Sequence, residues 1–516
     1  RLASTRAAEG DLQELSYTYD AVGNPVGIRD AARDALWFAN AEVTADAAYA
    51  YDALYRLVRA TGREHVGQSG QPDDRDVPLQ PLPHTGDGAA MRRWTETYAY
   101  DAVGNLLEVA HRAEGATAAL GSWTRRYADA ADSNRLLATS VPGDDPAGPW
   151  SATYAHDAHG SMTRMPHLPT MAWDHADRLR ATARQVMADG TPETTHHVYD
   201  AAGERVRTVT DAEAAPGVAP RRRRERIRIG GFEVYREYAA DGSTVTLARE
   251  TLHVMDGARR VALVETRTIG DDGSPARLVR FPLADHLGSA RVEVDDAGRV
   301  VSYEEYHPWG TTAYRAHDAA LGAPARRHRY TGQERDEESG LARHGARYYA
   351  PWLGRWTAAD PAGLEAGVNR FAFCHDAPVR YVDPDGRNPV LFWLFVVTAP
   401  WFLANDQSTA DPRMDSHIRE GLRGVAATAD RAGLPSGFMR EVLDDPGVYF
   451  SRAGQITPTT MGRGGNLYLP VWNEMPLDIE RVEHPRYNTS LFYHELTHAF
   501  IDRRLDRGDP RLEGLV

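Results

Sequence analysis

Aromatic and polar residues alternate along the first three quarters of the chain in a unit that recurs six times. The shared unit reads aromatic, any residue, aromatic, Asp, two small residues, Gly-Asn or a substitute, and then alternating apolar positions, and the last three copies match it more weakly. The units begin at Tyr17, Tyr49, Tyr98, Tyr154, Ala172 and His197. A period of two is typical of a half-buried strand, and Asp-x-x-Gly-Asn supplies turn residues. The pattern therefore predicts a series of β-hairpins.

A row of hairpins cannot bury both of its faces, so the units are expected to join into larger sheets. The spacing of the units is irregular, which predicts insertions such as the Pro/Gly/Asp-rich loop near 67–88. Of the 23 tyrosines, only four lie after residue 387. The sequence thus predicts a mainly β region that ends near residue 387.

The units resemble the YD repeats of Rhs proteins and of the C component of insecticidal Tc toxin complexes. The resemblance continues through five short segments and closes with a long stretch similar to the Rhs-associated core domain. These segments are MPHLPTMAWD at 165–174, GGFEVYREY at 230–238, ETLHVMD at 250–256, DHLGSA at 285–290, YEEYHPWG at 303–310 and the closing stretch at 330–363. The resemblance implies a β-sheet spiral shell over 1–387, divided into a repeat shell at 1–310 and the Rhs-associated core at 311–387.

In this family the shell encloses a toxic C-terminal domain that varies between members, which implies a bacterial toxin that is secreted or delivered into a target cell. About 387 residues are too few for a closed shell. Either a second repeat protein completes it or the chain is a fragment, and the first residue, Arg1, favours a fragment. The resemblance also implies a cognate immunity protein and a passenger that acts in the cytoplasm of the target cell.

Two Asp-Pro-x-Gly units, at 360–363 and 383–386, lie near the end of the core. By themselves they predict turns. The family resemblance implies an aspartyl self-cleavage site formed by Asp360 and Asp383, assisted by Arg347, with the cut between residues 386 and 389. Two carboxyl groups in contact share a proton, so that one serves as acid and the other as base. Family members commonly have leucine where this chain has Arg387, so the turn interpretation stays open beside self-cleavage.

Residues 388–516 do not continue the repeat and predict a small α+β domain. Within an apolar helical pattern, His494 and His498 are separated by one helical turn, so both imidazoles can bind one zinc ion. Glu495, next to the first histidine, is placed to act as general base. The sequence therefore predicts a zincin-like metallopeptidase that contains zinc and cleaves a protein substrate.

The third zinc ligand is open: Glu513 is favoured over Asp502, because three ligands from one helix would approach the ion along one line, and a ligand beyond Val516 is the other alternative. Two other functions also remain open. The domain could be a non-proteolytic effector with a structural HELTH segment, or the chain could be a YD-repeat adhesion or interaction protein.

Composition changes this picture little. The chain has a formal net charge of −14 and a pI near 5.8, which argue against general nucleic-acid binding. All 59 basic residues are arginine, and the arginine-rich run at 221–228 predicts an outward strand face instead of a nucleic-acid site. The apolar run at 390–404 is too short for a bilayer and contains Pro400, which favours a buried segment over a membrane span, while a role in crossing or plugging stays open. The resemblance implies contact with a membrane only transiently, during delivery.

Overall fold

The computed structural model describes residues 5–7, 10–73, 90–256, 259–364, 367–387 and 390–391. The chain divides into a unit at Arg1–Phe392 and a unit at Trp393–Val516, and every described residue lies in the first. The predicted α+β domain and its zinc ligands therefore lie outside the described residues. The predicted boundaries at 310/311 and 387/388 stay predictions.

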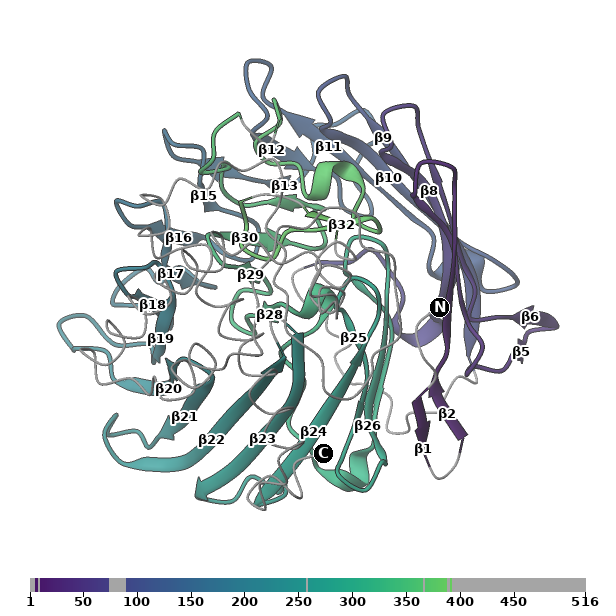
Figure 1. Cartoon of the computed structure of the whole chain (residues 1–516). Coiled ribbons are helices and arrows are strands. Elements are labelled where there is room, and N and C mark those ends of the chain that lie inside the picture. The colour runs from purple at the N-terminus through teal and green to yellow at the C-terminus, as the bar shows by residue number, and fades with distance from the viewer. Residues whose placement is uncertain are drawn as a thin grey trace, which may run out of the picture. The chain divides into compact units, whose positions relative to one another are not determined.

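Two long antiparallel sheets, in which almost every strand pairs with its neighbour in sequence, dominate the described residues (Figure 1). The first has nine strands: β3 (Leu15–Tyr19), β4 (Pro25–Asp30), β7 (Ala47–Tyr51), β8 (Leu57–His65), β9 (Met91–Tyr100), β10 (Leu106–Ala113), β11 (Trp123–Asp129), β12 (Leu136–Thr139) and β13 (Ala152–Thr153). The second has twelve: β16 (Thr170–Trp173), β17 (Leu179–Ala183), β18 (Thr194–Tyr199), β19 (Arg205–Asp211), β20 (Arg222–Ile229), β21 (Phe232–Tyr238), β22 (Val245–Asp256), β23 (Arg259–Ile269), β24 (Arg277–Ala284), β25 (Ala290–Val294), β26 (Val300–Tyr306) and β27 (Thr312–His317). The prediction of a mainly β region is confirmed.

The remaining elements are short. Four small sheets are formed by β1 (Thr5–Ala7) with β2 (Gly10–Gln13), β5 (Leu36–Phe38) with β6 (Ala41–Val43), β14 (Ala155–His156) with β15 (Met162–Arg164), and β32 (Tyr381–Val382) with β33 (Val390–Leu391). A four-stranded sheet comprises β28 (Glu334–Arg335), β29 (Ala342–His344), β30 (Arg347–Ala350) and β31 (Arg355–Trp356). The 3-10 turns are η1 (Val66–Gln68), η2 (Ala118–Leu120), η3 (Ala319–Leu321), η4 (Tyr330–Gly332) and η5 (Cys374–Asp376). Within the described ranges, no helix has the length and apolar character to cross a bilayer.

All six predicted units form antiparallel hairpins. In five of the six turns, the aspartate Oδ1 atom accepts the backbone N–H groups two and four residues later. Asp101, for example, accepts from Val103 at 2.9 Å and from Asn105 at 2.8 Å. Gly104 has a φ of +88°, a left-handed conformation that disfavours a side chain. The repeat signature therefore determines its own turn.

The second aromatic residue of a unit ties its hairpin to the preceding one. The hydroxyl of Tyr51 donates to the Pro25 carbonyl oxygen at 2.9 Å. The hydroxyl of Tyr100 donates to the Leu57 carbonyl oxygen at 2.7 Å. These bonds explain why tyrosine recurs at this position: its ring packs in the core while its hydroxyl satisfies a backbone carbonyl of the neighbouring hairpin.

The segment 330–382 packs against both long sheets. Figure 1 shows its strands β28, β29, β30 and β32 between β8–β13 and the strands that follow β16. The largest buried apolar cluster includes Leu57 from the first sheet, Leu179 from the second, and Tyr349 and Trp356 from this segment. The segment 330–382 is thus an internal part of the described fold.

The prediction that the arginine-rich run forms an outward face is wrong for Arg226 and Arg228, although it holds for Arg223, whose side chain is 61% exposed. Arg226 Nη1 lies 2.5 Å from Glu233 Oε1, and Arg228 Nη2 lies 2.8 Å from Glu334 Oε1. Ile229, which alternates with these arginines in the sequence, is 71% exposed. The fold places Arg226 beside Glu233 of the neighbouring strand β21 and Arg228 beside Glu334 of β28, because a buried carboxylate requires a counter-charge.

Candidate functional site

A buried cluster of charged side chains lies where the two Asp-Pro-x-Gly units meet strand β30. Arg347 Nη2 lies 2.9 Å from Asp360 Oδ2 and 2.9 Å from Asp383 Oδ2. The three side chains are at most 3% exposed. The structure therefore brings together the three residues that the family resemblance indicated for self-cleavage.

The second Asp-Pro-x-Gly unit docks on the turn between β29 and β30. The backbone N–H of Ala346 donates to the Asp385 carbonyl oxygen at 2.9 Å. Gly386 has a φ of +69°, and a Cβ atom there would lie 2.2 Å from the His344 carbonyl oxygen. Only glycine allows this close approach of the two backbones.

The peptide bond between Gly386 and Arg387 is held at both ends by this cluster. The Nε–H of Arg347 donates to the Gly386 carbonyl oxygen. The N–H of Arg387 donates to Asp383 Oδ1 at 3.0 Å. One guanidinium thus contacts both aspartates and the carbonyl group, while one of the carboxylates faces the amide nitrogen.

Burial and neighbouring groups set the electrostatics of the cluster. Burial raises the pKa of Asp383 to about 6, although the Arg347 guanidinium opposes the rise. The guanidinium carbon of Arg347 lies 4.1 Å from the centre of the Trp356 ring, which holds it in place by a cation–π contact. His344 Nδ1 lies 2.7 Å from the Asp383 carbonyl oxygen, and burial lowers the pKa of this imidazole to about 4. A carboxyl group with a pKa near 6 can act as a general acid at mildly acidic pH.

Asp360 also forms the turn that its sequence signature predicts. Its Oδ1 atom accepts from the Ala362 N–H at 2.8 Å, and its carbonyl oxygen accepts from the Gly363 N–H at 3.1 Å. Its Oδ2 atom remains directed at Arg347. Turn and charged cluster are therefore compatible, because each uses a different carboxylate oxygen.

Sequence reasoning did not identify Trp356, His344 or Gly386 as parts of this site. Gly386 carried a signal as the last residue of the second Asp-Pro-x-Gly unit, but the signature indicates a turn and not a close backbone approach. The contacts of Trp356 and His344 arise from tertiary packing and leave no local pattern. The predicted zinc ligands His494, His498 and Glu513, and the predicted base Glu495, lie outside the described residues.

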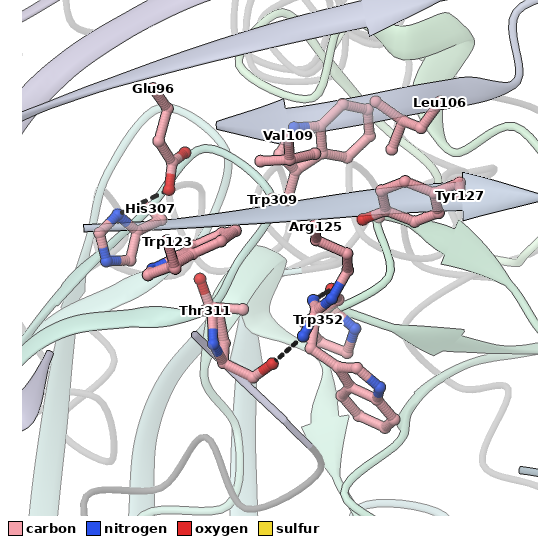
Figure 2. Close-up of a pocket in the computed structure, with 13 residues that line it drawn as sticks. Glu96, Leu106, Val109, Trp123, Arg125, Tyr127, His307, Trp309, Thr311 and Trp352 are labelled. Atoms are coloured by element: carbon pink, nitrogen blue, oxygen red, sulfur yellow. Dashed lines mark hydrogen bonds and ion pairs between the residues drawn. The ribbon is translucent and has the colours of Figure 1, made fainter. Parts of the chain in front are cut away.

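A second group of ionisable side chains, missed by sequence reasoning, joins strands β9 and β10 of the first long sheet to the residue that follows β26. Donor atoms of Glu96, His111 and His307 lie within 4.8 Å of one another, and all three residues are buried. Figure 2 shows Glu96 and His307 facing each other beside a small cavity. Glu96 and His111 lie on neighbouring strands, whereas His307 lies much later in the sequence, so no spacing motif predicted the group.

No family model matches the chain. It is 32% identical over 387 residues to the toxin subunit YenC2 of Yersinia entomophaga, a match that covers 74% of this chain and 38% of YenC2. The described residues are similar to the Rhs shell of Tc toxin subunits. The crystal structure of TcdB2-TccC3 matches with a TM-score of 0.63 and 27% identity, over 74% of this chain and 18% of that one. This chain therefore spans well under half the length of YenC2 and of the TcdB2-TccC3 chain.

A weaker match extends the likeness to toxins with other activities. The double-stranded DNA deaminase toxin A of Burkholderia cenocepacia is 26% identical over 311 residues, which cover 57% of this chain and 19% of the toxin. Similarity in the shell region therefore does not indicate which activity a passenger domain has.

Proposed function

We propose that this Rhs-type shell protein cuts its own backbone between Gly386 and Arg387. The observation that carries the proposal is the position of Arg347, which contacts Asp360, Asp383 and the Gly386 carbonyl oxygen together. The cut would separate the described shell segment from the residues that follow, and so free a passenger domain. It lies within the interval indicated by the family resemblance.

The geometry supports a hydrolytic mechanism with one acid and one base. Asp360 takes a proton from a water molecule as the water oxygen attacks the Gly386 carbonyl carbon. Arg347 stabilises the negative charge that develops on the carbonyl oxygen. Asp383, which faces the amide nitrogen, donates its proton to Arg387 as the C–N bond breaks. The products are a carboxyl group on Gly386 and an amino group on Arg387.

We expect self-cleavage to slow as the pH rises above about 6. The general acid must carry its proton, and burial raises the pKa of Asp383 to about 6. Below this pH the protonated form dominates, whereas above it the rate should fall roughly tenfold per pH unit. The test is a gel time course of freshly translated chain in buffers spanning this pH. A rate that does not change across the range would contradict the assignment of Asp383 as the acid.

We further propose that residues 388–516 act as a zinc peptidase. The support is the HELTH segment, in which His494 and His498 would bind zinc with Glu513 as third ligand. Bound zinc would polarise the scissile carbonyl of a substrate and lower the pKa of water. Glu495 would accept a proton and pass it to the leaving amine.

The Glu495→Gln variant of the full chain is expected to lose peptidase activity by roughly 10²- to 10⁴-fold because the general base is removed. Its zinc content should match that of the wild type, because Glu495 is not a ligand. Proteomics of target cells that express each variant measures the loss of cleaved peptides. Glu483→Gln, a matched change outside the motif, should retain activity, and toxicity that survives Glu495→Gln would refute the proteolytic mechanism.

The partners we propose follow from the likeness to Tc toxin subunits. TcdB2 and TccC3 occur together in one solved structure, which supports a second repeat protein that completes the shell of this chain. We also propose delivery from a bacterium, action of the passenger in the cytoplasm of the target cell, and a cognate immunity protein.

A further inference from the structure

Two carboxylates and two imidazoles alternate around a buried ring on the inner side of the first sheet. The ring order is Glu64, His111, Glu96 and His307. His111 Nε2 lies 3.1 Å from Glu64 Oε2, and His111 Nδ1 lies 3.0 Å from Glu96 Oε1. His307 Nδ1 lies 3.6 Å from Glu96 Oε1, and His307 Nε2 lies 3.9 Å from Glu64 Oε2. Each ring side chain is at most 9% exposed.

Strand register places two members of this ring, Glu96 and His111, next to each other, with Trp123 beside them. Glu96 in β9 lies directly opposite His111 in β10, and His111 lies opposite Trp123 in β11. Directly opposite residues project from the same face of a sheet, so their side chains meet. His307 arrives from a different sheet, immediately after β26. The ring therefore joins the first repeat sheet to the end of the second.

We propose that Glu96, His111 and His307 bind one divalent metal ion of the zinc class and so link the two sheets. Their donor atoms lie within 4.8 Å of one another. In a tetrahedral zinc site with bonds of about 2.0–2.1 Å, ligand atoms lie about 3.3 Å apart. The distances from Glu96 Oε1 to the two imidazole nitrogens, 3.0 and 3.6 Å, lie on either side of this value. Imidazole and carboxylate ligands suit zinc and cobalt.

An unsatisfied nitrogen independently supports the site. His307 Nδ1 is buried and makes no hydrogen bond to any residue that the structure describes. Buried polar atoms are nearly always satisfied, so this nitrogen calls for a partner. A metal ion between it and Glu96 Oε1 would supply one.

Neighbouring side chains orient the proposed metal ligands. Glu64 lies beside the Nε2 atom of His111, the nitrogen opposite the proposed ligand atom, and Arg92 Nε lies 2.8 Å from the other Glu64 oxygen. A carboxylate on the far nitrogen fixes the tautomer and orientation of a ligating imidazole. The Tyr98 hydroxyl donates to the Oε2 atom of Glu96, which leaves Oε1 for the ion.

Aromatic walls and a small cavity complete the site. The ring of Trp123 stacks on that of His111, with centroids 5.3 Å apart and planes inclined by 3°. The cavity is lined by Glu96, Trp123, His307 and Thr311 (Figure 2). It leaves the proposed ion one direction from which a fourth ligand, such as water, can approach.

A proton on His111 would compete with the metal ion for this site. Burial alone would lower the pKa of His111, but its hydrogen bonds to Glu64 and Glu96 raise it to about 9. Metal binding must therefore displace a proton from this imidazole. If no metal binds, the same four side chains form a protonated ion-pair network, which the test below distinguishes.

The test measures Co²⁺ binding by the full chain in a background variant, His494→Ala with His498→Ala, that removes the other predicted metal site. We expect one equivalent of Co²⁺ that survives gel filtration and shows the visible absorption of a tetrahedral nitrogen and oxygen site. Glu96→Gln should abolish this spectrum. His197→Gln, which alters a buried histidine outside the ring, should preserve it.

A second variant keeps the result decisive if Glu96→Gln does not fold, as judged by circular dichroism. Glu64→Gln should retain the spectrum but weaken Co²⁺ affinity by roughly 10- to 100-fold, the usual effect of removing an outer-shell partner. A folded background variant that binds no Co²⁺, or binding that neither ring substitution changes, would overturn the proposal. Neither outcome bears on self-cleavage, because Arg347 and its aspartates are intact in all these variants.

Discussion

The Asp383→Asn variant is expected to remain one uncut chain of 57.0 kDa, whereas the wild type should separate into two polypeptides. Asparagine keeps the shape of the side chain but cannot deliver a proton to the leaving amide nitrogen. Loss of a positioned general acid typically costs 10²- to 10⁴-fold in rate, enough to leave the chain intact during purification. Denaturing gel electrophoresis measures the outcome directly.

The matched controls separate chemistry from folding. Asp360→Asn removes the proposed base and should block cleavage to a similar extent. Asp296→Asn changes an exposed aspartate in a distant turn and should cut like the wild type. An Asp383→Asn chain that still separates into two polypeptides would show that the cut does not use this carboxyl group.

The second large effect is expected at Arg205, whose fully buried guanidinium links β19 to the core segment. It forms a two-pronged contact with Asp336, at 2.6 and 2.8 Å, and contacts Glu334 at 3.0 Å. Arg205→Met would remove the arginine that pairs with the buried carboxylate of Asp336. Removing one partner of a buried ion pair typically costs 3–5 kcal/mol, and we expect a loss of about that size in the free energy of unfolding.

Urea-induced unfolding, followed by tryptophan fluorescence, measures this loss. Arg223→Met is the matched control, because Arg223 is 61% exposed and pairs with Glu193 at the surface. Exposed pairs contribute at most about 1 kcal/mol, so this variant should unfold almost like the wild type. Equal unfolding midpoints for both variants would mean that the core segment is not held by Arg205.

Local chemistry made the hairpins predictable. The contacts that form the turn at Asp101 all lie within four residues, so Asp101, Gly104 and Asn105 predict the turn without tertiary information. The same locality explains why the strand face at Arg228 was predicted wrongly. Its direction depends on Glu334, a residue more than a hundred positions away, which no local pattern contains.

The candidate sites show a similar division. The resemblance to Rhs proteins indicated Arg347, Asp360 and Asp383, and the structure brings these three together. The resemblance could not indicate that the Gly386 carbonyl oxygen accepts a hydrogen bond from Arg347, because that contact depends on how two loops dock. The ring that contains His307 was not predictable at all, since its members meet only when the second sheet returns to the first.

Intact-mass measurement and N-terminal sequencing of the purified wild-type chain test the central claim most directly. Self-cleavage at the held peptide bond predicts two polypeptides, one ending at Gly386 and one whose first residue is Arg387. A single intact chain in mildly acidic buffer, or a new N-terminus elsewhere in the sequence, would contradict the account.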